Sequence, residues 1–182
     1  MEVQTTKLPG LLRLVPVLHR DARGHLCEVF QACRLAEEGI DCTFVQDNWS
    51  RSVRGVVRGL HYQRPPSAQA KLINCVRGAI WDVAVDLRSQ SPTFGKWEAF
   101  ELSEENSHQL FIPVGFAHGF AVLSDLADVI YKCSAYHDPA TEAGVHWAEP
   151  ELALPWPVRD PIVSPRDQQN PSLASYRRAP AW

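Results

Sequence analysis

The clearest alternation of apolar and polar positions runs from Ala79 to Arg88. Apolar side chains occupy every second position, at Trp81, Val83, Val85 and Leu87, and polar side chains stand between them, at Asp82, Asp86 and Arg88. Successive side chains of a strand point to opposite faces, so this pattern predicts a strand with one buried face. On that prediction, Asp82 and Asp86 lie on the opposite, polar face.

The segment before it, 71–76, is also strand-like and ends at Arg77-Gly78. A two-residue turn of this kind predicts that 71–76 and 79–88 form a hairpin. Further strands are predicted at 56–63, 97–102, 109–112, 118–123 and 129–136. Short strands at such spacing, with proline and glycine between them, are typical of a β-sandwich or a small barrel.

Helical patterning is confined to Gln31–Glu38, where Gly39 is placed to end the helix. The tail after Trp147 carries seven prolines and is predicted to follow the surface as irregular coil with short turns. Neither a linker nor a repeat divides the chain. We therefore expect one domain over residues 1–182, with a core at about 40–150 against which the N-terminal strands and the proline-rich tail pack.

The composition narrows the possible partners. The chain has 182 residues, 45% of them apolar, and a net charge of 18 − 21 = −3, which disfavours both disorder and nucleic acid binding. Its five cysteines are odd in number and lack a C-x-x-C pair, so reduced thiols are expected rather than disulfides or a zinc site. No apolar run is long enough to span a membrane. These features favour a cytoplasmic protein without a membrane anchor.

Three residues stand out as candidates for chemistry, although each has an ordinary structural reading. His61 lies within three residues of Arg58 in a predicted strand, but a lone histidine there is more often a half-buried structural side chain. Tyr131 shares the inner parity of its strand with Val129 and Cys133, as a core tyrosine would. Lys71 shares a parity with apolar positions, where it needs a counter-charge unless it reaches solvent from the strand end.

The sequence gives little support to a metal site or to a nucleophilic catalytic residue. Cupin barrels commonly bind a metal through a His-x-His pair, but Tyr62-Gln63 follows His61 here, and we expect no metal. The chain also lacks a Gly-x-Ser-x-Gly turn and a phosphate-binding glycine-rich loop.

A family resemblance emerges when the motifs are read in order. They are Asp21-Ala22-Arg23-Gly24, Val45-Gln46-Asp47-Asn48-Trp49-Ser50, Arg58-Gly59-Leu60-His61-Tyr62-Gln63, Ala68-Gln69-Ala70-Lys71, Ser91-Pro92-Thr93-Phe94-Gly95, Ile112-Pro113-Val114-Gly115-Phe116-Ala117-His118-Gly119-Phe120 and Tyr131-Lys132-Cys133. Together they resemble the dTDP-4-dehydrorhamnose 3,5-epimerase family over nearly the whole chain. The resemblance implies an all-β, cupin-like jelly roll with short peripheral helices. It also implies a homodimer that acts on a dTDP-4-keto-6-deoxyhexose without any cofactor.

The resemblance assigns four catalytic roles that suit proton transfer next to a ketone. His61 matches the family base and Tyr131 the family acid, which would deliver a proton to the opposite face of the carbon. Asp167, in Ser164-Pro165-Arg166-Asp167, matches the carboxylate that orients the base, with Arg166 in place of the usual lysine. Lys71 would stabilise the enolate oxygen.

Substrate contacts are implied in the same way. Arg58 would help to hold the substrate, and a bulge at Gly59 would bring it to the face of His61. Diphosphate and sugar contacts are assigned to Arg23, Gln46, Asn48 and Arg166, and Glu28, His118 and Glu142 line the family pocket. Base stacking falls to Tyr136, or to the ring at His137, where the family often has a second aromatic residue. Trp49 stands where a histidine is frequent, and its bulk is expected to reshape the sugar end of the pocket.

Three alternatives stay open on the sequence. A relative of the same fold that inverts only C3 or only C5 would share the base and the acid. A catalytically inactive jelly roll would bind the sugar nucleotide and leave it unchanged. A metal-dependent cupin oxygenase is disfavoured by the missing His-x-His pair.

Overall fold

A computed structural model describes all 182 residues. The strands are β1 (Glu2–Thr5), β2 (Leu12–Val15), β3 (Leu18–Asp21), β4 (Gly24–Cys27), β5 (Gln46–Val53), β6 (Val56–Gln63), β7 (Lys71–Arg77), β8 (Ala79–Asp86), β9 (Trp97–Ser103), β10 (Gln109–Ile112), β11 (Phe116–Val122), β12 (Leu126–Cys133), β13 (Glu142–Gly144) and β14 (Ile162–Val163). The helices are α1 (Ala32–Glu37), α2 (Leu173–Arg178) and a 3-10 turn, η1 (Asp167–Gln169). The five strands predicted from spacing correspond to β6, β9, β10, β11 and β12.

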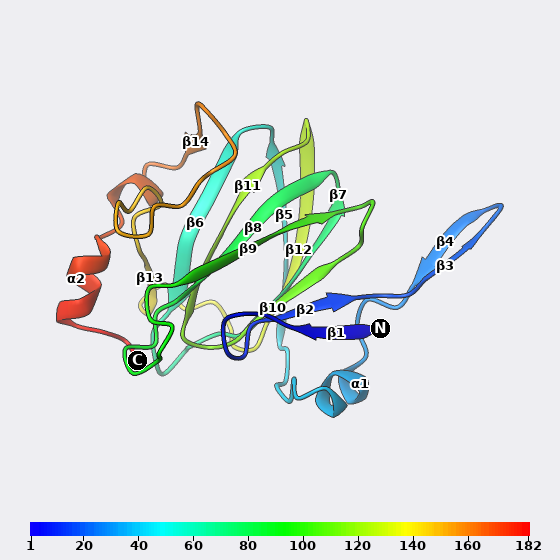
Figure 1. The fold of residues 1–182 in the computed structure, drawn as a ribbon, viewed down its shortest axis with the longest axis horizontal. Coiled ribbons are helices and arrows are strands. Elements are labelled where there is room, and N and C mark those ends of the chain that lie inside the picture. The colour runs from blue at the N-terminus through cyan, green and yellow to red at the C-terminus, as the bar shows by residue number, and fades with distance from the viewer.

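Two sheets make up the body of the molecule (Figure 1). One has the order β1-β2-β10-β7-β12-β5, and the other has the order β13-β6-β11-β8-β9 with β14 paired to β6. All pairs are antiparallel except that of β14 with β6. The arrangement confirms the predicted all-β jelly roll with short helices at its periphery.

Apolar side chains fill three layers. The largest cluster lies between the sheets and includes Ile73 of β7, Ile80 of β8 and Phe120 of β11. A second cluster covers the outer face of the β6-β11-β8 sheet, where Leu173 and Tyr176 of the C-terminal segment pack. The third contains Leu35 of α1 against the other sheet. Both sheets are thus partly covered on their outer faces, which keeps the strands around the site rigid.

The predicted hairpin of 71–76 and 79–88 is wrong. β7 pairs with β10 and β12 in one sheet, whereas β8 pairs with β11 and β9 in the other. Gly78, at φ +73°, turns the chain from one sheet into the next, and a Cβ there would lie 2.1 Å from the Leu126 carbonyl oxygen. A tight turn was read correctly, but it is a corner between sheets.

The prediction that β8 has a single buried face is also wrong. Asp82 and Asp86 are both fully buried, because their face lies between the sheets with Ile80 and Ala84. Val83 and Val85 face the second cluster, beneath the C-terminal segment. The alternation of the sequence therefore separates two buried faces of different polarity.

Helix α1 lies where predicted, with Gly39 at φ +85° just after it. The tail was predicted to be irregular, but it also contains β14, η1 and α2. Ser172 caps α2 by accepting a hydrogen bond from the Ser175 N–H. No helix of the structure has the length and apolar character needed to cross a membrane.

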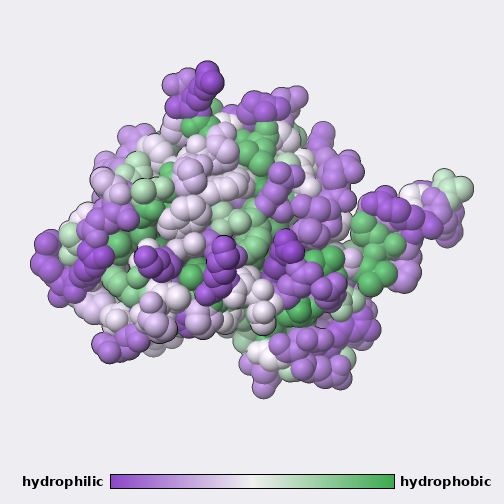
Figure 2. All heavy atoms as spheres, viewed as in Figure 1, coloured by the Kyte–Doolittle hydropathy of each residue, from purple (hydrophilic) through white to green (hydrophobic).

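The hairpin of β3 and β4 projects away from the two sheets (Figure 1). It forms a separate two-stranded sheet. The space-filling view shows hydrophobic surface along this arm (Figure 2), and Val17, Leu26 and Val29, on the arm or next to it, are exposed.

Candidate active site

A cavity opens between the two sheets, lined by strands from both. The side chains that line it are mostly polar or charged: Asn48, Ser50, Arg58, His61, Gln63, Gln69, Lys71, His118, Tyr131, His137 and Glu142. No group of three or more His, Cys, Asp or Glu side chains is arranged to hold a metal ion.

His61 and Asp167 form a hydrogen-bonded pair in this cavity. Nε2 of His61 lies 2.6 Å from Oδ1 of Asp167, and the Gly59 N–H donates to Oδ2 of the same carboxylate. Asp167 reaches β6 from η1, so the tail supplies it. Burial alone would raise the pKa of Asp167, but hydrogen bonds from His61 and Gly59 and the charge of Arg166 hold it below its ordinary value. The carboxylate is therefore ionised at neutral pH and fixes the ring of His61.

A β-bulge brings Arg58 and His61 to the same cavity, as the sequence predicted. His118 pairs with His61 and Phe120 pairs with Arg58, so β6 holds one residue more than β11 between these pairs. Gly59, at φ +134°, allows the bulge, because a Cβ there would lie 2.6 Å from the Cα of Gly119.

Tyr131 and Lys71 enter the cavity from the sheet opposite His61. Tyr131 lies across from Asn48 on β5, and Lys71 lies across from Cys133 on β12. Burial raises the pKa of Tyr131, which keeps the phenol protonated. Burial also lowers the pKa of Lys71. The cavity thus holds an imidazole from one sheet and a phenol and an amine from the facing sheet, so a base and an acid approach it from opposite sides.

A second histidine–aspartate pair, His118 with Asp82, lies deeper in the cavity. Nε2 of His118 is 2.8 Å from Oδ2 of Asp82, whose side chain is fully buried. The sequence analysis missed Asp82 because it assigned the polar positions of β8 to an exposed face. The sequence did hold a signal, since Asp82 shares its strand parity with the apolar residues Ile80 and Ala84, which indicates a buried carboxylate.

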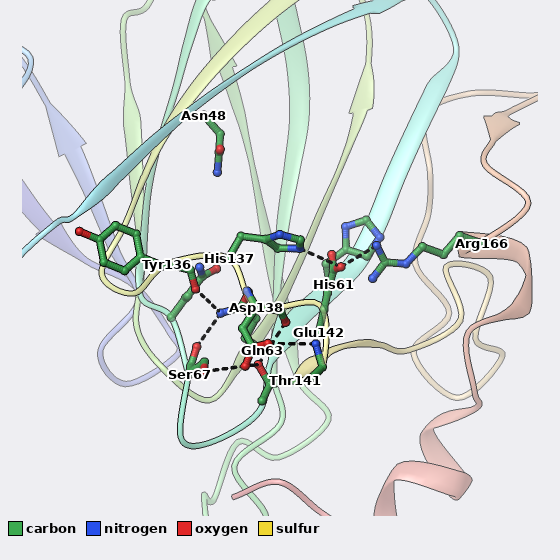
Figure 3. Close-up of polar contacts among 12 residues, drawn as sticks. Asn48, His61, Gln63, Ser67, Tyr136, His137, Asp138, Thr141, Glu142 and Arg166 are labelled. Atoms are coloured by element: carbon green, nitrogen blue, oxygen red, sulfur yellow. Dashed lines mark hydrogen bonds and ion pairs between the residues drawn. The ribbon is translucent and has the colours of Figure 1, made fainter.

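Glu142 links Arg166 and His137 near His61 (Figure 3). Its Oε2 accepts from Nη1 of Arg166 at 2.8 Å and from Nε2 of His137 at 3.0 Å. Burial would raise the pKa of Glu142, but these hydrogen bonds lower it overall. Nearby, Gln63 holds the segment after β12 by donating to the Ser67 and Tyr136 carbonyls and accepting from the Asp138 N–H.

Of the other residues predicted to contact the substrate, some lie at the cavity and others lie away from it. Asn48 lines the cavity, and its Oδ1 accepts a hydrogen bond from Gln46. Tyr136 is 70% exposed, and its ring points away from the Glu142 cluster (Figure 3). Arg23 and Glu28 lie outside the cavity of their own chain. Arg23 pairs with Asp21 on the projecting arm, and Glu28 pairs with Arg34 of α1.

Trp49 does not reshape the sugar end of the pocket, contrary to expectation. It is 65% exposed on the outer face of β5, where its indole N–H donates to Asp128. Alternation along β5 turns Asn48 and Ser50 inward and Trp49 outward.

Comparisons with known proteins identify the family of the chain. The family model for dTDP-4-dehydrorhamnose 3,5-epimerase matches residues 5–175. The chain belongs to this family. It is 47% identical to the Shigella flexneri dTDP-4-dehydrorhamnose 3,5-epimerase over 169 residues, which cover 92% of this chain and 93% of the relative. It is also 43% identical to a dTDP-4-dehydrorhamnose 3-epimerase from Streptomyces niveus, covering 98% of this chain and 87% of the relative.

Solved structures of family members superpose closely. The Legionella pneumophila epimerase in complex with dTDP-4-keto-L-rhamnose has a TM-score of 0.92 and 46% identity, covering 95% of this chain and 93% of that one. NovW, a 4-keto-6-deoxy sugar epimerase from Streptomyces spheroides, has a TM-score of 0.95 and 43% identity, covering 98% and 90%. The chain is therefore an isomerase of the sugar-nucleotide epimerase type.

Proposed function

We propose that the protein inverts both C3 and C5 of dTDP-4-keto-6-deoxy-D-glucose to give dTDP-4-keto-L-rhamnose. The observation that carries the proposal is the single cavity shared by His61, Tyr131 and Lys71, with His61 on one sheet and the other two on the facing sheet. The hydrogens on C3 and C5 are acidic because both carbons flank the C4 ketone. No cofactor enters the proposed reaction.

His61 is the proposed base. Its Nε2 faces Asp167, so the lone pair of the neutral ring is on Nδ1, which takes the proton from the carbon. The C–H electron pair moves into an enolate, and the ammonium of Lys71 stabilises the negative oxygen. The ionised Asp167 stabilises the imidazolium that forms.

Tyr131 is the proposed acid. Its phenol, kept protonated by burial, delivers a proton to the face of the carbon opposite His61. The enolate electrons return to form the new C–H bond and restore the ketone. His61 then loses its extra proton and Tyr131 regains one, so the pair is ready for the second carbon.

The nucleotide contacts of the proposal use residues around the cavity. Arg166, Gln46 and Asn48 would hold the diphosphate and the sugar, and Tyr136 would stack on the base. The complex of the Legionella relative with dTDP-4-keto-L-rhamnose supports a dTDP-sugar as ligand. An arginine suits a phosphate because its planar guanidinium donates two parallel hydrogen bonds.

We also propose a homodimer in which the projecting arm completes the partner's site. Arg23 and Glu28 were predicted to bind substrate, yet they lie outside the cavity of their own chain. The side chain of Arg23 is 90% exposed on an arm that stands clear of the body (Figure 1). A second copy would bury the apolar surface of this arm. The cytoplasmic location stays a prediction from the sequence.

A single inversion at C3 is the second candidate. It is favoured by the similarity to the Streptomyces niveus 3-epimerase and by the ChmJ 3'-monoepimerase of Streptomyces bikiniensis, at a TM-score of 0.90 and 38% identity. The base, acid and lysine would act in the same way at one carbon.

Deuterium wash-in distinguishes the candidates. The protein is incubated with dTDP-4-keto-6-deoxyglucose in deuterated water, and the label is located by mass spectrometry and NMR. Label at C3 and C5 supports the double inversion, and label at C3 alone supports the 3-epimerase. A sugar that binds without label would show the inactive binding module instead.

Two variants test the assigned roles. His61→Ala should abolish wash-in at both carbons, whereas Tyr131→Phe should keep some wash-in and lose inversion. His108→Ala and Tyr176→Phe are matched controls outside the cavity. The latter loses the hydrogen bonds of the phenol with the Leu87 carbonyl and the Ala181 N–H. Full turnover in either cavity variant would remove that residue from the mechanism.

A further inference from the structure

One carboxylate oxygen of Asp82 has no hydrogen-bond partner, although the residue is buried where an unpaired negative charge is destabilising. The residue is fully buried, and its Oδ2 is bonded to His118, but Oδ1 has no hydrogen-bond partner. Its neighbours on the inner face of β8 are Ile80 and Ala84. A half-satisfied carboxylate in such surroundings is destabilising unless a charge nearby offsets it.

Lys71 is the complementary case on the opposite sheet. It stands on the inner face of β7 with Ile73 and Cys75, and it lines the same cavity as His118. Lys71 takes part in no ion pair of the structure. In contrast, His61, His118 and Glu142, which line the same cavity, each have an oppositely charged or hydrogen-bonded partner. Burial lowers the pKa of Lys71, and the nearby Cys133, Glu142 and Asp82 oppose that effect.

Several groups face Lys71, and their charges decide which one matters. From its own sheet come Tyr131 and Cys133 of β12. From the facing sheet come His61 and Arg58 of β6, Asp82 of β8, His118 of β11 and Glu142 of β13.

Of these groups, only two are carboxylates. Glu142 is already shared by Arg166 and His137. The cation of Arg58 repels an ammonium, and its Nε donates to Ser52. Asp82 is thus the fully buried carboxylate, and one of its oxygens has no hydrogen-bond partner and is free to face the charge of Lys71.

We propose that Asp82 is a positioning residue that keeps Lys71 protonated, and that His118 holds the Asp82 carboxylate in place for this purpose. The inference rests on the proposed function, since it matters only if Lys71 stabilises the enolate. An amine that lost its proton would offer the enolate oxygen no positive charge. The Asp82 carboxylate therefore extends the pH range over which the enzyme works.

The sign of the effect follows from the mutual attraction. The active form of Lys71 is the ammonium, so the rate falls as pH rises through its pKa. Replacing the Asp82 carboxylate by an amide removes the anion that favours the ammonium. The falling limb of the pH profile should then move to lower pH, by about one unit for charges separated by one or two side-chain lengths in a protein interior.

The test measures deuterium wash-in against pH in the Tyr131→Phe protein, with and without Asp82→Asn. The Tyr131→Phe background removes the phenol from the profile, so the falling limb reports Lys71. Asp86→Asn is the matched control: Asp86 is equally buried on the same face of β8, but it bonds Arg88, Ser91 and Thr93 outside the cavity. We expect Asp82→Asn to shift the limb and Asp86→Asn to leave it in place.

Two results would overturn the proposal: an unmoved limb in Asp82→Asn, whether or not the rate falls at every pH, or an equal shift in Asp86→Asn. If Asp82→Asn does not fold, His118→Asn carries the test. That variant removes the imidazole that holds the Asp82 carboxylate in place, so its falling limb should also move to lower pH, and an unmoved limb would overturn the proposal. Absence of wash-in in the wild-type protein would instead refute the proposed function.

Discussion

A hydrogen-bonded carboxylate determines what His61 can do. Asp167 accepts from Nε2 of His61 and from the Gly59 N–H, one contact on each oxygen. The ring is therefore held in one tautomer, and its other nitrogen is left for the substrate. The same charge stabilises the imidazolium that appears when the ring has taken a proton.

Asp167→Asn should lower the wash-in rate by about a hundredfold or more, because the amide keeps the shape and loses the charge. Steady-state wash-in at saturating substrate measures the loss, and unchanged dTDP binding by calorimetry serves as the control. A rate within a few-fold of wild type would show that the carboxylate charge is dispensable.

The same substitution should change acid stability with a defined sign. The folded pKa of Asp167 lies below its unfolded value, so its contribution to stability is present above that unfolded value, about 3.9, and is lost as pH falls through the folded pKa. Urea unfolding should show Asp167→Asn less stable than wild type at neutral pH. The two proteins should converge at low pH, and a constant difference would contradict the assignment.

The direction in which a side chain points could be predicted where the alternation along its strand had only one possible interpretation. Tyr131 and Lys71 face inward as their parity indicated. Asp82 was misplaced because both faces of β8 are buried, so polarity along the strand no longer marked solvent. Trp49 points outward because its neighbours on β5 face the cavity. Alternation separates two faces, but only packing tells which lies against a cavity.

At the scale of one element, the bulge of β6 decides whether the site forms. Without the extra residue, strict alternation would put Arg58 and His61 on opposite faces of the sheet. Gly59 makes the bulge possible by combining a positive φ with close approach to Gly119.

Gly59→Ala should therefore destabilise the protein by about 3 kcal/mol or more, from backbone strain together with the clash. Gly24→Ala is a matched control, since Gly24 has φ +127° but nothing within 4 Å of the added Cβ. It should cost about 1–2 kcal/mol, the strain alone. Urea unfolding of both variants gives the comparison, and equal losses would exclude the close contact as the cause.

Elements whose signal is local were predicted well, and those that depend on long-range packing were not. The bounds of β6 and β10 agree with the sequence. The corner at Gly78 was read as a hairpin because a tight turn does not reveal which sheet its second strand joins. Helix α2 was missed because prolines dominate the tail, although Ser172 caps it and Tyr176 anchors it through the Leu87 carbonyl.

At the scale of the whole molecule, the projecting arm of β3 and β4 has no role that a single chain explains. The proposed dimer predicts complementation between two defective proteins. Arg23→Ala should bind dTDP at least tenfold more weakly, and His61→Ala should be inactive. When the two are mixed and allowed to exchange subunits, one site of each mixed dimer combines an intact His61 with an intact Arg23.

Activity should therefore reappear on mixing, at a substrate concentration where Arg23→Ala alone is nearly inactive. Sedimentation velocity establishes the dimer independently. Arg20→Ala, on the same arm, is a control for general damage to β3 and β4. A mixture no more active than its components would show that the arm does not serve the partner's cavity.

The pairing of His61 with Asp167 could not be derived from spacing, because the two residues are far apart in the chain and meet only when the tail packs on the sheet. The family resemblance supplied that pairing, and the fold gives its physical basis: the second apolar cluster holds the tail against the sheet that contains β6.

Asp167 follows every strand of the two sheets along the chain, and this order has a consequence for biosynthesis. His61, Lys71 and Tyr131 leave the ribosome well before the carboxylate that orients the imidazole. A polypeptide released just short of η1 would contain every strand of the two sheets. It would lack Asp167, the carboxylate that orients His61. Catalytic competence therefore requires that synthesis continues past the last strand, and a chain that stops before η1 should be inactive even though its strands are present.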